Sequence, residues 1–304
     1  MIGNYNGWLF LDKPIGISSN KTLQKVRKIF SNTKAGYVGT LDPLASGFLP
    51  IALGKATKTI KYLEEEIKEY IFTIRWGSAT STGDSEGIIT HRKALYPNKS
   101  QILDQVEKVK KIQDQVPPKY SAIKINGERA YSLARKGKSF KMPKRKIKIL
   151  GFKLLELINK NEASFWIKCS SGTYIRSLAE QIGILLNTHG HIRSLRRVGF
   201  GNLDKKLISL DSLLNLMHID KLIQALKPID YIFKTERKIN LDSEEAKLLL
   251  HGKSIKVDLK NKFEMEMVKE CLKPSVAVYK KQFVAIGNIE NNSFYPKTVL
   301  NLIS

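Results

Sequence analysis

The sequence is poor in cysteine and in long hydrophobic runs. Its two cysteines, Cys169 and Cys271, lie far apart, and neither belongs to a CxxC pattern or to zinc-ligand spacing. This usage is typical of a reducing compartment. No stretch approaches the ~18–20 apolar residues of a membrane-spanning helix, and the opening MIGNYNGWLFLDKP lacks the features of a signal peptide. We therefore expect a soluble, cytoplasmic protein with no membrane partner.

Signatures of common cofactor sites are also missing. The chain contains no Walker A motif, no GxGxxG after a strand and no GxSxG. His189 and His191 form an HxH pair, but a metal site needs a third and usually a fourth ligand, and none lies nearby in sequence. We therefore expect neither a cofactor nor a metal.

Acidic residues are scarce relative to basic ones. The chain has 52 Lys and Arg against 28 Asp and Glu, a net charge of +24. Such an excess attracts polyanions, and nucleic acid is the leading candidate. An anionic membrane surface is the weaker alternative, and a biased genome composition would raise the lysine count without functional meaning.

What is present indicates a globular protein of mixed α/β class. The hydrophobic share of 42% and the length of 304 residues allow one large domain, or a large and a small one. Apolar spacing predicts helices over 20–30 and 99–113 and strands at the start of the chain, over 69–76 and over 163–169. Ser18 or Ser19 can cap the first helix.

Two segments are predicted to be loops because glycine, proline or small polar residues dominate them. Residues 34–59 are expected to form a structured loop, and the stretch SATSTGDSEG a polar one. A strand-to-helix junction follows Gly172, and its predicted buried stripe has the spacing of a helix. The residues of that stripe are Ile175, Leu178, Ile182 and Leu185.

The chain divides into a larger and a smaller part. Residues 117–149 mix cations with aromatics and form a basic excursion, either an RNA clamp or a solvated basic face. After residue 237 a capping pair, Asp242 and Glu245, predicts the start of a short helix. A hairpin is predicted over 276–280 and 283–289. We predict domains at 1–237 and 238–304, the second a small β module.

A few polar and aromatic residues are candidates for chemistry. Asp42 lies in GTLDPLASG, where a Gly- and Pro-shaped loop can present a carboxylate as nucleophile or base, although an Asp before Pro is also a common turn residue. Arg176 could pair with it and keep it ionised, or bind phosphate at the surface. Tyr70 and Tyr174 could stack on an unpaired base, or belong to the core.

Several segments in order resemble the TruB family of tRNA pseudouridine-55 synthases. The resemblance implies a pseudouridine synthase fold, with a long, bent, mostly antiparallel sheet, and a small C-terminal β-barrel of PUA type. It also makes 117–149 an RNA-binding insertion. The segments that carry it are GWLFLDKPIGISSN, KAGYVGTLDPLASGFLPIALGKATK, KEYIFTIRWGSATSTGDSEG, VPPKYSAIKINGERAYSLARKG, CSSGTYIRSLAEQIG and LRRVGFG.

The resemblance also implies roles for single residues. Asp42 matches the catalytic aspartate, Arg176 the arginine paired with it, and Tyr70 the tyrosine that stacks beside the target base. The family usually has histidine five residues before the aspartate, where this chain has Tyr37, so pocket details near the flipped base should differ. Three further residues match pocket or near-site positions, namely Tyr174, Leu195 and Asp84.

The activity implied is isomerisation of uridine 55 in the T-loop of tRNA, by an aspartate acting on a flipped-out base. The implied partner is the tRNA T stem-loop, with no obligate protein partner and a monomeric enzyme. Two alternatives stay open. The chain could be a catalytically silent RNA-binding protein or tRNA chaperone on the same fold, or it could modify another RNA site.

Overall fold

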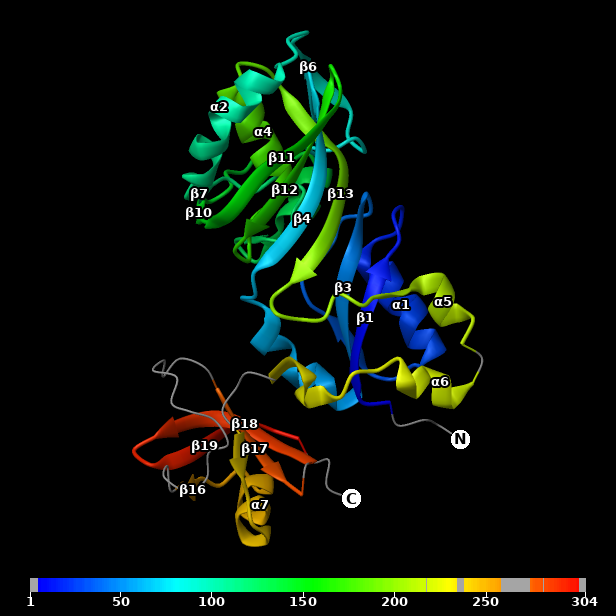
Figure 1. Cartoon of the computed structure of the whole chain (residues 1–304), viewed down its shortest axis with the longest axis vertical. Coiled ribbons are helices and arrows are strands. Elements are labelled where there is room, and N and C mark those ends of the chain that lie inside the picture. The colour runs from blue at the N-terminus through cyan, green and yellow to red at the C-terminus, as the bar shows by residue number, and fades with distance from the viewer. Residues whose placement is uncertain (1–4, 217, 234–237, 258–273, 281, 301–304) are drawn as a thin grey trace.

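Two sheets of different size organise the chain (Figure 1). The structure, a computed structural model, describes residues 5–216, 218–233, 238–257, 274–280 and 282–300. The larger sheet has the order β11-β12-β4-β13-β3-β1-β14, with β2 paired to β3, and only β1–β14 and β3–β13 are parallel pairs in it. Its strands are β1 (Gly7–Lys13), β2 (Ala35–Tyr37), β3 (Ala45–Leu53), β4 (Lys68–Trp76), β11 (Ile149–Asn159), β12 (Glu162–Cys169), β13 (Gly190–Phe200) and β14 (Ile208–Ser209).

Helices cover the two ends of this sheet separately. At the β11 end, Ile102 of α2 (Lys99–Lys110) and Leu178 of α4 (Ile175–Leu185) share a core with Phe72 and Phe165. At the β1 end, α1 (Ser19–Ile29) packs its buried face with α5 (Leu210–Leu214) and α6 (Ile219–Gln224) (Figure 1). Within the residues that the structure describes, no helix has the length and apolar character needed to span a bilayer.

Most elements predicted from periodicity are confirmed, as is the mixed α/β class with a mostly antiparallel sheet. The strand predicted over 69–76 is β4, the strand over 163–169 lies within β12, and the helix over 99–113 is α2, which ends at Lys110. The helix over 20–30 is α1, whose cap is Ser18, since its side chain accepts from the backbone N–H of Lys21 at 3.2 Å.

The loop predicted over 34–59 is wrong for most of its length. It contains β2, β3 and the start of a 3-10 helix, η1 (Gly54–Leu63). β3 lies between β13 and β1 and is buried almost throughout, so it lacks the alternation that marks a half-buried strand. Gly47 and Pro50, which suggested a loop, lie inside this central strand.

Two smaller predictions also need correction. Leu185 is 40% exposed and does not belong to the buried stripe of α4, where Ala179 is buried instead. The polar stretch after residue 77 is not wholly a loop, because β5 (Ser78–Thr80) pairs with β6 (Ile89–Arg92). Both errors concern element ends, where periodicity carries the least information.

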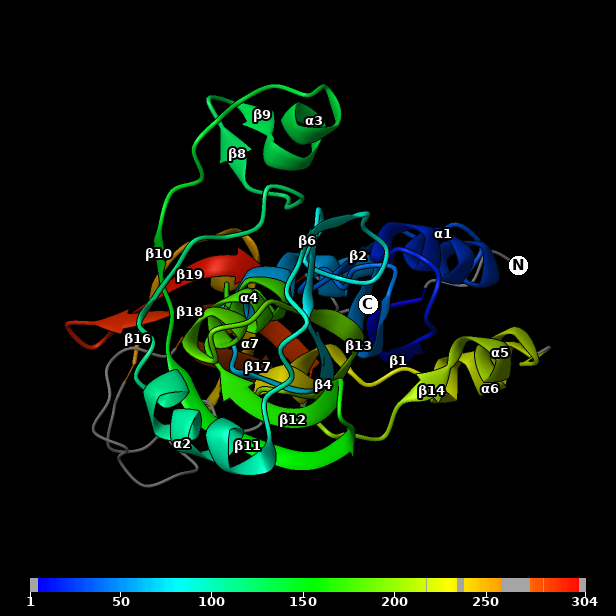
Figure 2. The ribbon, with the colours of Figure 1, turned by 90° about the horizontal axis from the view of Figure 1, so that it is seen from above.

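The basic excursion 117–149 forms a small lobe that stands away from the body (Figure 2). It holds β8 (Lys124–Ile125), β9 (Glu128–Arg129) and α3 (Ala130–Arg135), packed on a small apolar cluster around Met142. At its base, β7 (Asp114–Gln115) pairs with β10 (Arg145–Lys146). The lobe is thus joined to the body by a narrow two-stranded stem.

The C-terminal sheet is formed after residue 237. A capping box of Asp242 and Glu245 starts α7 (Ser243–Leu250), and β17 with β18 forms the predicted hairpin, so both predictions are confirmed. The sheet curls in a way consistent with a PUA-like module. The predicted domain boundary, between 237 and 238, adjoins residues 234–237, which lie outside the described part of the chain. The strands are β15 (Lys238–Asn240), β16 (Ile255–Lys256), β17 (Ser275–Tyr279), β18 (Gln282–Glu290) and β19 (Ser293–Val299).

This second sheet shares apolar contacts with the first. Phe233, at the end of η2 (Ile229–Phe233), stacks on Phe283 with ring centroids 5.6 Å apart. Val276 and Phe283 belong to the same core cluster as Trp8 and Phe10 of β1. The C-terminal sheet is therefore packed against the β1 end of the large sheet.

Candidate active site

Asp42 lies in the loop between β2 and β3, and the backbone on both sides of it is tied down. The Ser19 hydroxyl accepts from the Leu41 N–H at 2.8 Å and donates to the Leu41 carbonyl oxygen at 2.9 Å. On the other side, the Gly16 N–H donates to the Pro43 carbonyl oxygen at 2.8 Å. Because Ser19 is buried, water does not compete for these bonds. The Asp42 side chain is therefore attached to a backbone that hydrogen bonds hold in place.

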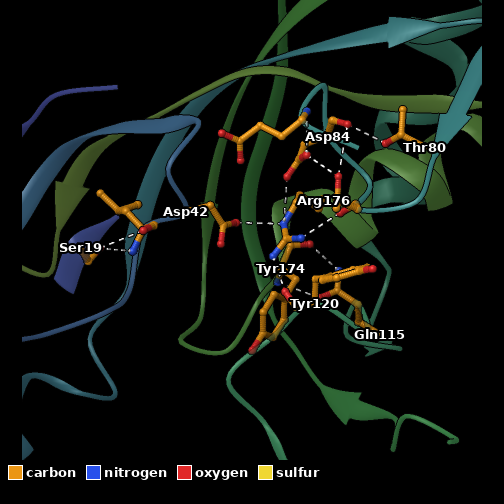
Figure 3. Close-up of polar contacts among 11 residues, drawn as sticks. Ser19, Asp42, Thr80, Asp84, Gln115, Tyr120, Tyr174 and Arg176 are labelled. Atoms are coloured by element: carbon orange, nitrogen blue, oxygen red, sulfur yellow. Dashed lines mark hydrogen bonds and ion pairs between the residues drawn. The ribbon is translucent and has the colours of Figure 1, made fainter. Parts of the chain in front are cut away.

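Arg176, in the first turn of α4, points its guanidinium at Asp42 (Figure 3). Its Nε lies 2.9 Å from Oδ2 of Asp42. Its Nη1 donates to the Thr82 carbonyl oxygen at 2.8 Å, and its Nη2 donates to the Tyr120 carbonyl oxygen at 2.9 Å. Since the planar group is bonded along three directions, its orientation toward the carboxylate is determined by the surrounding backbone.

A second carboxylate, Asp84, lies on the other side of Arg176. Its Oδ2 is 3.7 Å from Nε of Arg176, and its Oδ1 accepts from the Thr82 hydroxyl at 2.5 Å and from the Glu86 N–H at 3.1 Å. The Asp84 side chain is 3% exposed, whereas that of Asp42 is 36% exposed. Asp42 is thus the carboxylate that a ligand can reach, and Asp84 is enclosed by donors.

Burial and neighbouring charges shift the pKa of the Asp42 carboxyl in opposite directions. Burial, and then the nearby Asp84 charge, raise the pKa of the Asp42 carboxyl, while the Arg176 guanidinium and the Lys13 ammonium lower it. The net direction is upward. The ionised form is therefore lost at a higher pH than in an ordinary aspartate, and Arg176 limits this rise.

Lys13, which no sequence pattern singled out, is a fully buried cation near this carboxylate. It is 0% exposed, and its Nζ donates to the carbonyl oxygens of Pro14 at 2.8 Å and Ile17 at 2.6 Å. Burial lowers the pKa of the Lys13 ammonium to about 8. The only signal in the sequence was a lysine directly after the apolar run WLFLD.

Gln115, also missed, holds the start of α4. Its amide Nε2 donates to the Tyr174 carbonyl oxygen at 3.1 Å, and its Oε1 accepts from the Tyr174 N–H at 2.8 Å. The Ser177 hydroxyl donates to the Val116 carbonyl oxygen at 2.8 Å. With the Tyr120 bond to Arg176, these contacts join the stem of the basic lobe to the helix that carries the arginine.

Tyr70 and Leu195 lie on neighbouring strands beside the Asp42 loop. Both are 7% exposed, on β4 and β13, and both share the apolar cluster that contains Leu41 and Leu44 of that loop. Burial raises the pKa of the Tyr70 phenol. Leu195 pairs in register with Ala45, just after the Asp42 loop, and the Asp42 charge acts on the Tyr70 phenol, so both side chains lie near this loop.

The two remaining tyrosines occupy different surroundings. Tyr174 is the N-cap residue of α4, two residues before Arg176, and its half-buried ring packs against the small cluster of the basic lobe. Tyr37, on β2, packs instead against the cluster formed around α1 and β1. Tyr37 therefore lies outside the cluster shared by Tyr70 and Leu195.

The HxH pair is divided between two environments. His191 is buried, and its Nδ1 lies 3.0 Å from the Ser78 carbonyl oxygen, whereas the His189 ring contacts that of His91 at 5.5 Å between centroids. Among the residues with described positions, no three His, Cys, Asp or Glu side chains are grouped so as to hold a metal ion.

Known proteins are similar to this chain over nearly its whole length. The model of the TruB family pseudouridylate synthase N-terminal domain matches residues 27–175, and that of the tRNA pseudouridylate synthase B C-terminal domain matches 176–234. The tRNA pseudouridine synthase B of Bartonella henselae is 36% identical over 320 residues, which cover 98% of this chain and 96% of that protein. That of Caulobacter vibrioides is 39% identical over 251 residues, covering 82% of this chain and 81% of that protein.

A solved structure extends the likeness to the fold. It is an H/ACA RNP bound to a substrate RNA containing 2'-deoxyuridine, and one chain of it superposes with a TM-score of 0.71 at 23% identity. The match covers 96% of this chain and 84% of that chain. The predicted fold class, including the family resemblance on which it rested, is confirmed.

Proposed function

Because the chain belongs to the TruB family of pseudouridylate synthases, we propose that it isomerises uridine to pseudouridine at position 55 in the T-loop of tRNA. One observation carries the chemistry, a partly open Asp42 carboxylate held 2.9 Å from a buried guanidinium. The names of the similar proteins, tRNA pseudouridine synthase B, support tRNA as the substrate.

The reaction needs a nucleophile and a fixed geometry rather than a redox step. The N1–C1′ bond of uridine breaks, a C5–C1′ bond forms, the proton on C5 leaves and N1 gains a proton. No electrons are gained or lost, so neither an oxidant nor an energy source is required. In our proposal Asp42, as a carboxylate, attacks either the uracil ring or the ribose C1′ and thereby permits the base to turn.

The other predicted residues serve this step in our proposal. Arg176 keeps Asp42 ionised and aimed, and Asp84 braces Arg176 from behind. Tyr70 stacks beside the flipped base, because an extruded base loses its own stacking partners. Tyr174 and Leu195 line the uridine pocket. Tyr37 contacts RNA near the flipped base, where the family usually has histidine.

We propose that exposed positive charges bind the RNA. The lobe 117–149 presents exposed cations, which would neutralise phosphates of the T stem-loop. The C-terminal part, 238–304, would form a second RNA-binding domain after the catalytic domain 1–237. We further propose that the enzyme acts in the cytoplasm as a monomer, without an obligate protein partner or a cofactor. The exposed cations of the lobe include Lys124, Arg129, Arg135, Lys136, Lys138, Lys144, Arg145 and Lys146.

The test uses purified protein and an unmodified tRNA transcript without added cofactor. Transcripts carrying tritium at C5 of uridine release it when pseudouridine forms, and the modified position is read by chemical mapping. We expect one pseudouridine, at position 55, and none in a transcript with cytidine there. Binding without any conversion would favour the silent RNA-binding alternative. Conversion at a different position would favour another RNA site.

A further inference from the structure

Arg197 of β13 is a buried cation for which the proposed mechanism has no use. The residue is 1% exposed, and among the charged residues that the structure describes no carboxylate forms an ion pair with it. Burying a guanidinium without a counter-charge costs free energy. We therefore expect its hydrogen bonds to hold particular groups in place. Its bonds therefore identify its role.

Two of those bonds hold the backbone on either side of Asp42. Nε donates to the Phe48 carbonyl oxygen of β3 at 2.7 Å, and Nη2 donates to the Gly39 carbonyl oxygen, three residues before Asp42, at 2.8 Å. Tyr70 of β4 is opposite Arg197 in the sheet, and its phenol lies close enough for the Arg197 charge to lower its pKa. One guanidinium thus bonds the loop that leads to Asp42 and lies near the Tyr70 phenol.

The sheet places Arg197 where it can do this. β13 lies between β4 and β3, and in register Arg197 is opposite Tyr70 on one side and Gly47 on the other. β4 and β3 do not pair with each other in this sheet. The relative position of Tyr70 and the Asp42 loop is therefore transmitted through β13.

Two glycines leave room for this arrangement. A Cβ on Gly39 would lie 2.9 Å from Nη1 of Arg197, and a Cβ on Gly47 would lie 2.2 Å from its carbonyl oxygen. Both glycines have positive φ, 68° and 98°, which other residues rarely adopt. The backbone before and after Asp42 is thus closely fitted around Arg197.

We propose that Arg197 is a positioning residue, which holds the Asp42 loop and the Tyr70 ring at the mutual distance that the isomerisation requires. This rests on the function proposed above. Lysine should not replace it, because its single ammonium on a flexible stem lacks the planar fork whose Nε and Nη2 bond the Phe48 and Gly39 carbonyl oxygens separately.

The experiment compares Arg197→Lys and Arg197→Met with Arg196→Met as matched control. Arg196 is the next residue on the same strand, but it is exposed and pairs with Asp12 at 2.7 Å, away from this contact set. The full-length proteins are assayed in single turnover at saturating tRNA transcript, at a temperature where thermal melts show them folded. RNA affinity is measured separately by filter binding.

We expect both Arg197 variants to lose about 10- to 100-fold in the single-turnover rate, with RNA affinity within about threefold of the wild type. Arg196→Met should keep the rate within about threefold. In a Tyr70→Phe background, which lacks the hydroxyl, the loss caused by Arg197→Met should be smaller by about threefold or more. A role in stability alone would give the same loss in both backgrounds.

The outcomes separate this inference from the proposed function. If the wild type forms no pseudouridine, the proposed function fails first. If the wild type is active and the folded Arg197→Lys protein is equally fast, the positioning role is overturned. If neither Arg197 variant folds, it is overturned as well, since the arginine would then serve the fold and not the aim of Asp42.

Discussion

The Asp42 loop and the basic lobe 117–149 are both rich in turn residues, yet they are built in opposite ways. The loop is held by buried hydrogen bonds from Ser19 and Arg197 to its backbone. The lobe has strands of two residues each, a six-residue helix and a surface of exposed cations. The difference fits the two tasks that we propose, since bond chemistry depends on orientation within fractions of an ångström and phosphate binding depends on charge.

The largest effect on the reaction rate should come from a change in the Asp42 loop. Asp42→Asn removes the proposed nucleophile and leaves the shape of the loop, so the single-turnover rate should fall at least about 1,000-fold while RNA affinity stays within about threefold. Tritium release and filter binding measure the two quantities. Asp12→Asn, whose carboxylate pairs with Arg196 instead, is the control and should remain active. Wild-type conversion by Asp42→Asn would disprove the catalytic assignment.

Arg176→Met should be next, with a loss of about 100-fold, because it removes the guanidinium that orients and ionises Asp42. The pH dependence gives a second readout. Activity requires the carboxylate, so it is present above the Asp42 pKa and lost as pH falls through it. Since Arg176 lowers that pKa, its removal should move the acidic limb of the rate profile to higher pH. An unmoved limb would contradict the electrostatic role.

Lys13, at the end of β1, tests how much stability is lost by burying a charge close to Asp42. Its pKa falls from 10.5 to about 8 on folding, so between these values the unfolded chain binds more protons and stability rises with pH. Between pH 8 and 10 the free energy of unfolding should rise by about 2 kcal/mol more in the wild type than in Lys13→Met. Urea unfolding at both pH values measures this. Lys25→Met, an exposed lysine of α1, should follow the wild type.

The smallest effect should come from the lobe. Lys138→Glu with Lys144→Glu reverses two exposed cations, so RNA affinity should fall about tenfold at moderate salt and its salt dependence should become shallower. The single-turnover rate at saturating RNA should stay within about twofold, measured by tritium release. Lys108→Glu on α2 is the control for charge alone. A slower saturated rate would mean that the lobe also shapes the active site, through Tyr120 and Gln115.

How much could be predicted depended on how local the interaction is. The amphipathic spacing of α1, the alternation of β4 and the Asp242–Glu245 capping box involve residues a few positions apart, and all three were predicted correctly. β3 was missed because burial on both faces removes the alternation that identifies a strand. The pairing of Asp42 with Arg176 was foreseen as a possibility, and the family resemblance strengthened it.

By itself the sequence determined the local elements, the excess of positive charge and the family motifs, because each depends on neighbouring residues or on composition. Only the tertiary structure decided that Ser18 caps α1 while Ser19 holds the Asp42 loop. It also decided that the charged Arg197 side chain is buried. Ser19 bonds a residue 22 positions away, and Arg197 bonds residues 149 and 158 positions away. No short pattern in a chain encodes such contacts, since the packing of whole sheets brings their partners together.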